Sequence, residues 1–128
     1  MRGPQNSYVT TVVGATLRAA EEKSALDPVV LDLRGVVDTF DALIVISGRN
    51  DRQVRALAEE VERLNTLAGV QPLHVEGLTE GEWVAIDYGD VIVHVFDEVD
   101  REYYDLEHLW SVPASRPERA AQGLSSEA

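Results

Sequence analysis

The chain has 128 residues, which is enough for one domain with a real core, and it contains no cysteine. Disulfides, thiolate metal sites and cysteine nucleophiles are therefore excluded. Its 23 acidic and 11 basic residues give a net charge of −12. Because affinity for nucleic acid rests largely on Lys and Arg, this balance argues against direct nucleic-acid binding. It favours a basic protein partner, or serves solubility alone.

Membrane insertion and secretion are not expected. No apolar run approaches the roughly 20 residues needed to span a bilayer. The opening residues, MRGPQNSY, lack the apolar core of a signal peptide. We therefore expect a cytoplasmic protein.

The first 47 residues predict a helix and two strands. Apolar residues at helical spacing predict a helix from Asn6 or Ser7, either of which can cap it, to about Lys23. Residues 29–33 form a short strand candidate. The run 42–47 is apolar without alternation, which is typical of a strand buried on both faces and hence central in a sheet.

A second helix and a further strand follow. An apolar stripe predicts a helix from the turn at 47–51 to about Ala68, with Gly69 as its stop. The next strand candidate covers residues 70–76, and Pro72 within it favours an edge position or the strand start.

The most informative stretch is GEWVAIDYGDVIVHVF, residues 81–96, which is typical of a β-hairpin. Its two strands cover residues 82–87 and 90–96, and Tyr88-Gly89 between them supplies a two-residue turn in which glycine can adopt positive φ. That turn predicts three opposed pairs: Asp87 with Asp90, Ala85 with Ile92, and Trp83 with His94.

Alternation gives the hairpin two different faces. One face is aliphatic core and consists of Val84, Ile86, Val91, Val93 and Val95. The other carries Trp83, Ala85, Asp87, Asp90, Ile92, His94 and Phe96. The second face is too polar for a dry core and too aromatic for an ordinary solvated surface, so it is the first candidate for function.

After Phe96, a short helix is expected to start at Asp97 or Asp100 and to place Tyr103, Leu106 and Trp110 on one face. This helix either seals the core or extends a partner surface. From Pro113 onward the apolar period is lost. We therefore expect one domain over residues 1–112 and a flexible tail over 113–128.

The order of these elements predicts the fold class. Helices and strands intermix along the chain, which indicates an α/β protein with a mixed β-sheet of about five strands and helices packed on it.

The turn at 47–51 permits two interpretations. Free amides at a helix start favour an anion, and three arginines lie between positions 49 and 55. Alternatively, Asn50 or Asp51 simply caps the helix. A single glycine before a helix is only a weak signal for an anion site.

The acidic and imidazole side chains give little support for catalysis. Asp38 with Asp41, and Asp87 with Asp90, are the nearest carboxylate pairs, but both lie at turns, where Asp is common for backbone reasons. None of the three histidines has a second ligand at metal spacing. We expect no metal, no cofactor and no enzymatic activity.

Three segments together resemble a known family. SGRNDRQVRALAEEVE, PLHVEGLTEGEWVAIDYGDVIVHVF and REYYDLEHLW occur here in the order and spacing of the ribosomal silencing factor family, also called RsfS or Iojap-like proteins. The resemblance covers about residues 7–112. It implies a fold similar to nucleotidyltransferases but without their catalytic acids. It also implies binding to the large ribosomal subunit through large-subunit ribosomal protein number fourteen. Such binding blocks joining of the small subunit and lowers translation when nutrients are short, and family members commonly look like homodimers.

The resemblance also implies where the partner binds. Its partner surface falls on Trp83, Asp87, Asp90, His94 and Phe96, with Arg101, Tyr103 and Tyr104 as an extension. Two other functions stay open on the residues themselves. One is a nucleotidyltransferase-like protein that binds a nucleotide at residues 47–52. The other is a homodimeric scaffold that uses the aromatic face only for self-association.

Overall fold

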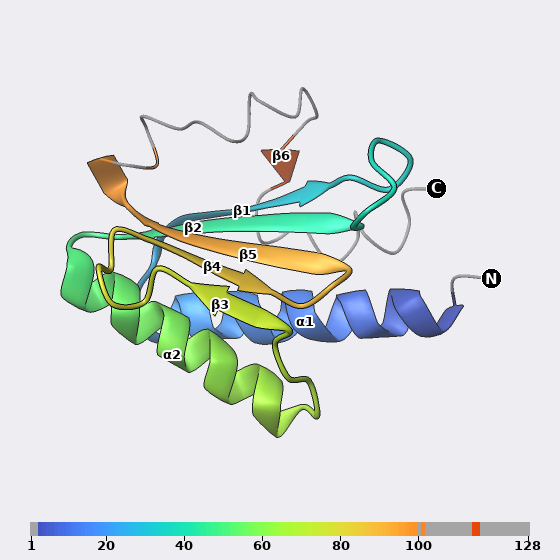
Figure 1. The fold of residues 1–128 in the computed structure, drawn as a ribbon, viewed down its shortest axis with the longest axis horizontal. Coiled ribbons are helices and arrows are strands. Elements are labelled where there is room, and N and C mark those ends of the chain that lie inside the picture. The colour runs from blue at the N-terminus through green and yellow to red at the C-terminus, as the bar shows by residue number, and fades with distance from the viewer. Residues whose placement is uncertain (1–2, 100, 102–113, 116–128) are drawn as a thin grey trace.

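The computed structural model describes residues 3–99, 101 and 114–115 (Figure 1). Over these residues it confirms the predicted α/β class, because two helices pack on a mixed sheet. The elements in chain order are α1 (Gly3–Glu22), β1 (Leu26–Asp32), β2 (Ala42–Gly48), α2 (Asp51–Leu67), β3 (His74–Glu76), β4 (Trp83–Asp87), β5 (Val91–Asp97) and β6 (Ala114–Ser115). α1 begins at Gly3, so the expected cap at Asn6 or Ser7 is wrong.

The six strands lie in the order β3-β4-β5-β2-β1-β6. β2 is central and buried at every position, as its unbroken apolar run predicts. It pairs in parallel with β5 and antiparallel with β1, which makes the sheet mixed. β3 is an edge strand and begins at His74 rather than at residue 70. The Leu73 N–H still donates to the Asp87 carbonyl of β4 at 2.7 Å, but Pro72 before it has no N–H to donate, so the ladder does not extend to residue 70.

The sixth strand was not predicted. Ala114 and Ser115 pair with Leu31 and Val30 of β1, although both residues lie in the expected flexible tail. The helix expected after Phe96 falls mostly outside the described residues. Among those residues, no helix is long and apolar enough to cross a bilayer.

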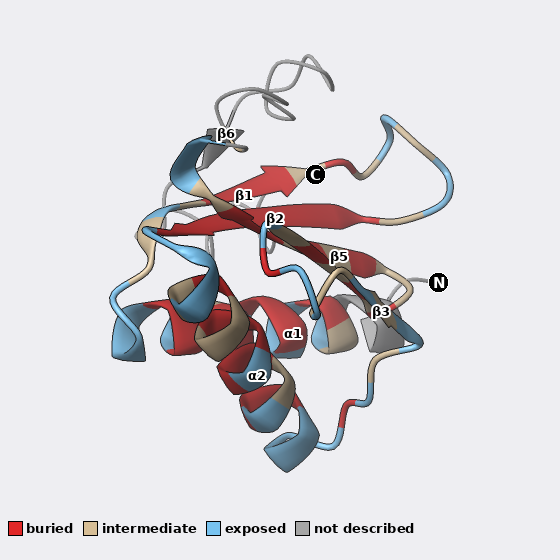
Figure 2. Cartoon of the chain, turned by 60° about the vertical axis from the view of Figure 1, so that its left-hand side comes forward, coloured by how far each residue is buried: buried red, intermediate tan, exposed pale blue. Residues whose placement is uncertain are grey.

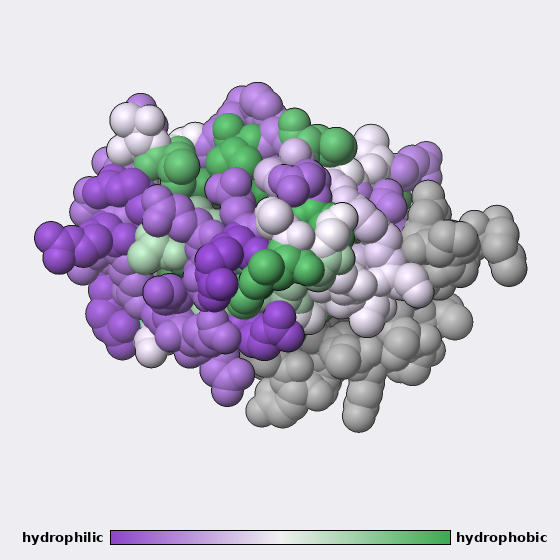
Figure 3. Space-filling model, turned by 90° about the horizontal axis from the view of Figure 1, so that it is seen from below, coloured by the Kyte–Doolittle hydropathy of each residue, from purple (hydrophilic) through white to green (hydrophobic). Residues whose placement is uncertain are grey.

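Both helices cover the same face of the sheet (Figure 1). Their buried sides turn toward the strands (Figure 2), as the apolar stripes of the sequence predict. The core between helices and sheet includes Val12, Leu57, Val61, Ile44 and Val93, all fully buried. Seen from the helix side (Figure 3), the surface is mainly hydrophilic with small apolar patches between charged groups.

The opposite face of the sheet is also apolar. A second cluster there is made of the buried residues Val29, Leu31, Leu33, Leu43, Val45 and Phe96. Four partly buried residues, Val37, Phe40, Trp83 and Ile92, pack against it. This sheet face therefore carries the aromatic side of the hairpin.

The hairpin has the predicted faces but a different turn. Asp87 pairs with Ile92, Ala85 with His94 and Trp83 with Phe96, so each pairing is two residues away from the expected one. The loop residues are Gly89 and Asp90, and the Tyr88 N–H donates to the Val91 carbonyl at 2.9 Å. Gly89 has φ +90°, at the first loop position where type II′ turns place glycine. A shift of two residues leaves the inward and outward sets unchanged.

Candidate partner-binding site

Three side chains from β4 and β5 form a cluster on the face of the sheet away from the helices. Trp83 and Phe96 are cross-strand partners, and His94 lies diagonally from Trp83. The indole Nε1–H of Trp83 donates a hydrogen bond of 2.8 Å to Nδ1 of His94. The Trp83 ring stacks on Phe96 with centroids 4.9 Å apart, and His94 stacks on Phe96 at 5.9 Å. Each ring is thus held by the other two.

The hydrogen bond from Trp83 determines which ring nitrogen of His94 carries the proton. An indole nitrogen can only donate, so Nδ1 must accept and the imidazole proton must lie on Nε2. Burial lowers the pKa of His94 to about 4, because the charged imidazolium would lose its water. The cluster is therefore uncharged at neutral pH, and its imidazole carries an N–H donor on the ring edge away from Trp83.

The three rings differ in what a partner could touch. Trp83 and His94 are partly exposed, whereas Phe96 is only 1 % exposed. Phe96 therefore supports the other two rings from beneath, which is a different position from the contact surface that the family resemblance implies. Sequence reasoning missed Val37 and Phe40, which pack against the same apolar cluster from the β1–β2 connection. The signal in the sequence was the presence of two large apolar residues, Val37 and Phe40, in an otherwise turn-rich segment.

The two hairpin aspartates lie at the turn end of the hairpin, away from the Trp83 ring. Asp87 is four residues from Trp83 along β4, about 13 Å at the rise of a strand, and it lies diagonally from His94 because it pairs with Ile92. Its Oδ1 accepts the Gly89 N–H at 2.8 Å, so it shapes the turn. The backbone carbonyl of Asp90 accepts the N–H of Asp41 at 2.7 Å and thereby joins the turn to the start of β2.

Arg101 turns toward the interior of the fold. Its guanidinium donates to the hydroxyl of Ser47 at 3.0 Å and to the backbone carbonyls of Leu26 and Asp27. The side chain is only 11 % exposed. Asp27 has φ +44°, a conformation that costs energy for a residue with a side chain, and the contact with Arg101 helps to hold it. Arg101 therefore joins the end of β5 to β1 and β2. The other two residues of the expected extension, Tyr103 and Tyr104, lie outside the described residues.

The turn before α2 is a helix cap. The side chain of Asn50 accepts the N–H of Gln53 at 2.9 Å, and Asp51 is the first helical residue. The capping interpretation of this turn is thus confirmed for Asn50. Among the described residues, no three His, Asp or Glu side chains gather closely enough to hold a metal ion.

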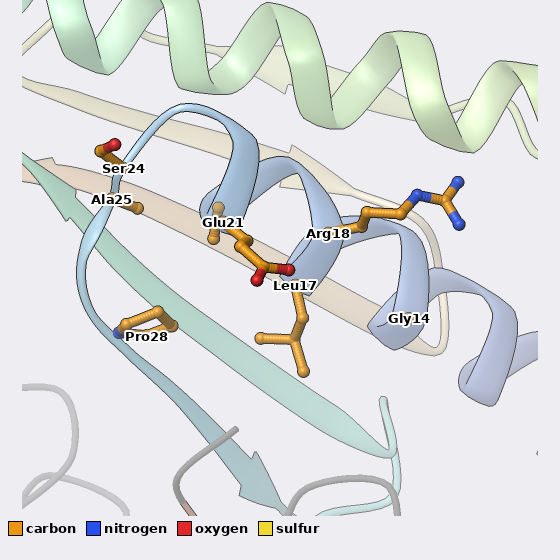
Figure 4. Close-up of a pocket in the computed structure, with 8 residues that line it drawn as sticks. Gly14, Leu17, Arg18, Glu21, Ser24, Ala25 and Pro28 are labelled. Carbon is orange, nitrogen blue, oxygen red and sulfur yellow. The ribbon is translucent and has the colours of Figure 1, made fainter. Parts of the chain in front are cut away.

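One open depression, of about 690 Å³, lies between the end of α1 and the start of β1. Figure 4 shows Leu17 and Glu21 of α1 and Pro28 of β1 along its walls. Leu17 packs against the core on the helix side of the sheet, whereas the aromatic cluster belongs to the opposite side. The depression is thus separate from the Trp83 site, and Arg18 and Glu21 are its charged lining residues.

Comparison with known proteins identifies similar chains. A family described as "Ribosomal silencing factor during starvation" matches residues 6–128, so the match includes the tail that the resemblance had left out. A ribosomal silencing factor from Bacillus subtilis is 40 % identical over 92 residues, which are 72 % of this chain and 78 % of that protein.

The chain is also similar to a solved structure and to a protein named for a mitochondrial process. The crystal structure of a protein from Chromobacterium violaceum superimposes with a TM-score of 0.76 at 38 % identity, covering 80 % of this chain and 85 % of that one. A more distant mouse protein, named for mitochondrial assembly of the ribosomal large subunit, is 23 % identical over 94 residues, covering 71 % of this chain and 41 % of that protein.

Proposed function

This chain belongs to the ribosomal silencing factor family, and we propose that it represses translation by binding the large ribosomal subunit where the small subunit would join. A bound domain occupies volume that the small subunit needs, so steric occlusion is sufficient. We infer a cytoplasmic, non-enzymatic regulator that works when nutrients are limiting. Its partner is large-subunit ribosomal protein number fourteen, and an ordinary interface of about 1,600 Å² would suffice.

The observation that carries this proposal is the state of Trp83. Its ring is partly exposed, stacks on buried Phe96 and donates its N–H to His94. A large aromatic ring that is held rigid before binding loses little conformational entropy on docking. Such residues at the centre of an interface commonly carry most of its free energy.

Two further observations support a ribosomal protein as the partner. The mouse relative is named for assembly of a ribosomal large subunit. The net charge of −12 favours a basic protein surface and disfavours bare RNA.

The test is binding of purified protein to isolated ribosomal subunits by sedimentation, with Trp83→Ala as the variant. We expect the native chain to pellet with large subunits and to prevent subunit joining. Trp83→Ala should weaken binding by about 2 kcal/mol or more, as for a central aromatic anchor. Leu67→Ala is the matched control, because Leu67 is an apolar residue 71 % exposed at the end of α2. Unchanged affinity in a folded Trp83→Ala protein would remove this face from the proposal.

We also infer that any homodimer uses the same face, because a partly exposed aromatic cluster suits self-association as well as partner binding. Adding large subunits should then convert dimer to monomer in analytical ultracentrifugation. A dimer that remains intact while bound to the subunit would show that the two faces are separate.

A further inference from the structure

The loop that leads into Trp83 follows an unusually constrained path. Gly77 and Gly81 have φ +87° and +72°, which side-chain-bearing residues rarely adopt. The Gly81 N–H donates to the Gly77 carbonyl at 3.0 Å, so the loop closes on its own start. A Cβ at Gly77 would collide with the carbonyl of Trp83. The backbone of Trp83 is therefore packed directly against the beginning of this loop.

The first turn of α2 holds the tip of the loop. Arg55 Nη1 donates long hydrogen bonds of 3.3 and 3.4 Å to the carbonyls of Thr79 and Glu80. Its Nη2 is oriented by Asp51 Oδ2 at 3.0 Å. Gly81 fits closely beneath them, since a Cβ there would lie 2.6 Å from Arg55 Nη1 and 3.0 Å from the Asp51 carbonyl.

We propose that Arg55 is a positioning residue for Trp83: it fixes the loop over residues 77–82 so that the indole meets His94 and Phe96. This inference rests on the proposed role of Trp83 in partner binding. Arg55 extends from α2, which packs on the helix side of the sheet, whereas the Trp83 ring packs on the other side. It therefore acts through the loop backbone and not by touching the partner.

The geometry at Trp83 tolerates little displacement. Its Nε1–H must reach His94 Nδ1 at 2.8 Å while its ring stays 4.9 Å from Phe96. Hydrogen bonds weaken steeply with distance and angle, so a small shift of the loop exit would break this contact. After the loop, the carbonyl of Glu82 accepts the Asp97 N–H at 2.9 Å. The part of the loop before Glu82 is held by its own hydrogen bond between Gly81 and Gly77 and by the contacts of Arg55 with Thr79 and Glu80.

The ion pair itself contributes little to global stability. The side chains of Arg55 and Asp51 are 35 % and 57 % exposed, and such pairs are strongly screened by solvent. Removing Arg55 should therefore leave the domain folded. An effect on Trp83 can then be separated from unfolding.

The first test is the indole N–H signal of Trp83 in a ¹H–¹⁵N spectrum, assigned with Trp83→Phe. We expect Arg55→Ala to move or broaden this signal, because the hydrogen bond to His94 changes. Arg52→Ala is the matched control, since it removes the same charge from the start of α2, and among the described residues no hydrogen bond or ion pair joins the Arg52 side chain to the loop. An unmoved Trp83 signal in Arg55→Ala would overturn the proposal.

The second test is a double-mutant cycle on binding to large subunits. Arg55→Ala should weaken binding roughly fivefold to tenfold in the native background and have no effect in the Trp83→Ala background. An equal loss in both backgrounds would show that Arg55 does not act through Trp83. If Trp83→Ala alone does not weaken binding, the proposed function of this face fails, while the indole signal still decides the positioning role.

A backbone variant gives an independent check. Gly81→Ala should displace the loop and move the same indole signal, because its Cβ would contact Arg55 and Asp51. Gly69→Ala is the matched control, since Gly69 has φ +88° with open space around a Cβ. Both glycines have a positive φ, which strains any residue with a side chain, so a movement of the indole signal in both variants would contradict a specific effect of the loop contact.

Discussion

Replacing His94 with asparagine should make the stability of the domain less sensitive to acid. Burial lowers the pKa of folded His94 to about 4, whereas a histidine in an unfolded chain titrates near 6.5. Between these values the unfolded chain binds a proton that the folded chain does not bind. The free energy of unfolding therefore falls as pH is lowered through this window. The stabilisation is complete above about pH 6.5 and is lost by about pH 4. Its full size is about 3 kcal/mol.

The hydrogen bond from Trp83 acts in the same direction. Protonated His94 would carry a hydrogen on Nδ1 and would point one donor at another across 2.8 Å. Asparagine cannot titrate, and its side-chain oxygen can accept from the indole near the former position of Nδ1. The substitution thus removes the proton site while it retains an acceptor.

The assay is urea unfolding of the native protein and His94→Asn at pH 7 and pH 4.5. Carboxylates titrate in both proteins and cancel in the comparison, so we expect His94→Asn to lose about 2 to 3 kcal/mol less than the native chain. Identical losses would refute the reasoning, because they would mean that His94 is protonated equally in the folded and unfolded states.

Two further substitutions test the supports of the fold. Arg101→Ala should lower the free energy of unfolding by about 1 to 3 kcal/mol, because it leaves the Ser47 hydroxyl and the β1 carbonyls without their donor. Thermal unfolding is the measurement, and Arg18→Ala is the control because Arg18 is exposed. Arg18→Ala should change the free energy of unfolding by less than about 0.5 kcal/mol, and equal effects of the two substitutions would contradict the internal role of Arg101. Asn50→Ala should cost about 1 kcal/mol through loss of the α2 cap. Asn50→Asp should retain the stability in chemical denaturation, and equal losses in both would assign Asn50 another role.

The sequence was sufficient for the two faces of the hairpin because alternation is a property of the pleat. Val84 and Ile86 point to the helices whatever the turn is. The turn itself was misplaced because Gly89 can occupy either loop position. The deciding feature was Tyr88, which is 1 % exposed and belongs to the core face. Burying the large ring of Tyr88 in the core is more favourable than exposing it in a loop. The space for this ring is formed by packing against the helices, which a local sequence pattern does not predict.

Long-range contacts account for the other differences. The charged segment around Arg101 predicts a surface position for its side chain. Its guanidinium nevertheless donates to Ser47, which lies 54 positions earlier in the chain. The expected tail also contributes β6, whose two residues find partners on β1. A two-residue strand has no periodicity to detect, so only the free edge of β1 determines where it pairs.

The charge and the aromatic cluster have separate tasks in the proposed complex. The net charge of −12 acts at a distance and should govern how fast a basic partner is encountered. The Trp83 cluster is uncharged at neutral pH because His94 stays neutral, so it contributes only at contact and should govern how slowly the complex dissociates. Surface charge changes should therefore alter the association rate and its dependence on salt. Changes at Trp83, or at the Arg55 loop contact that positions it, should alter the dissociation rate.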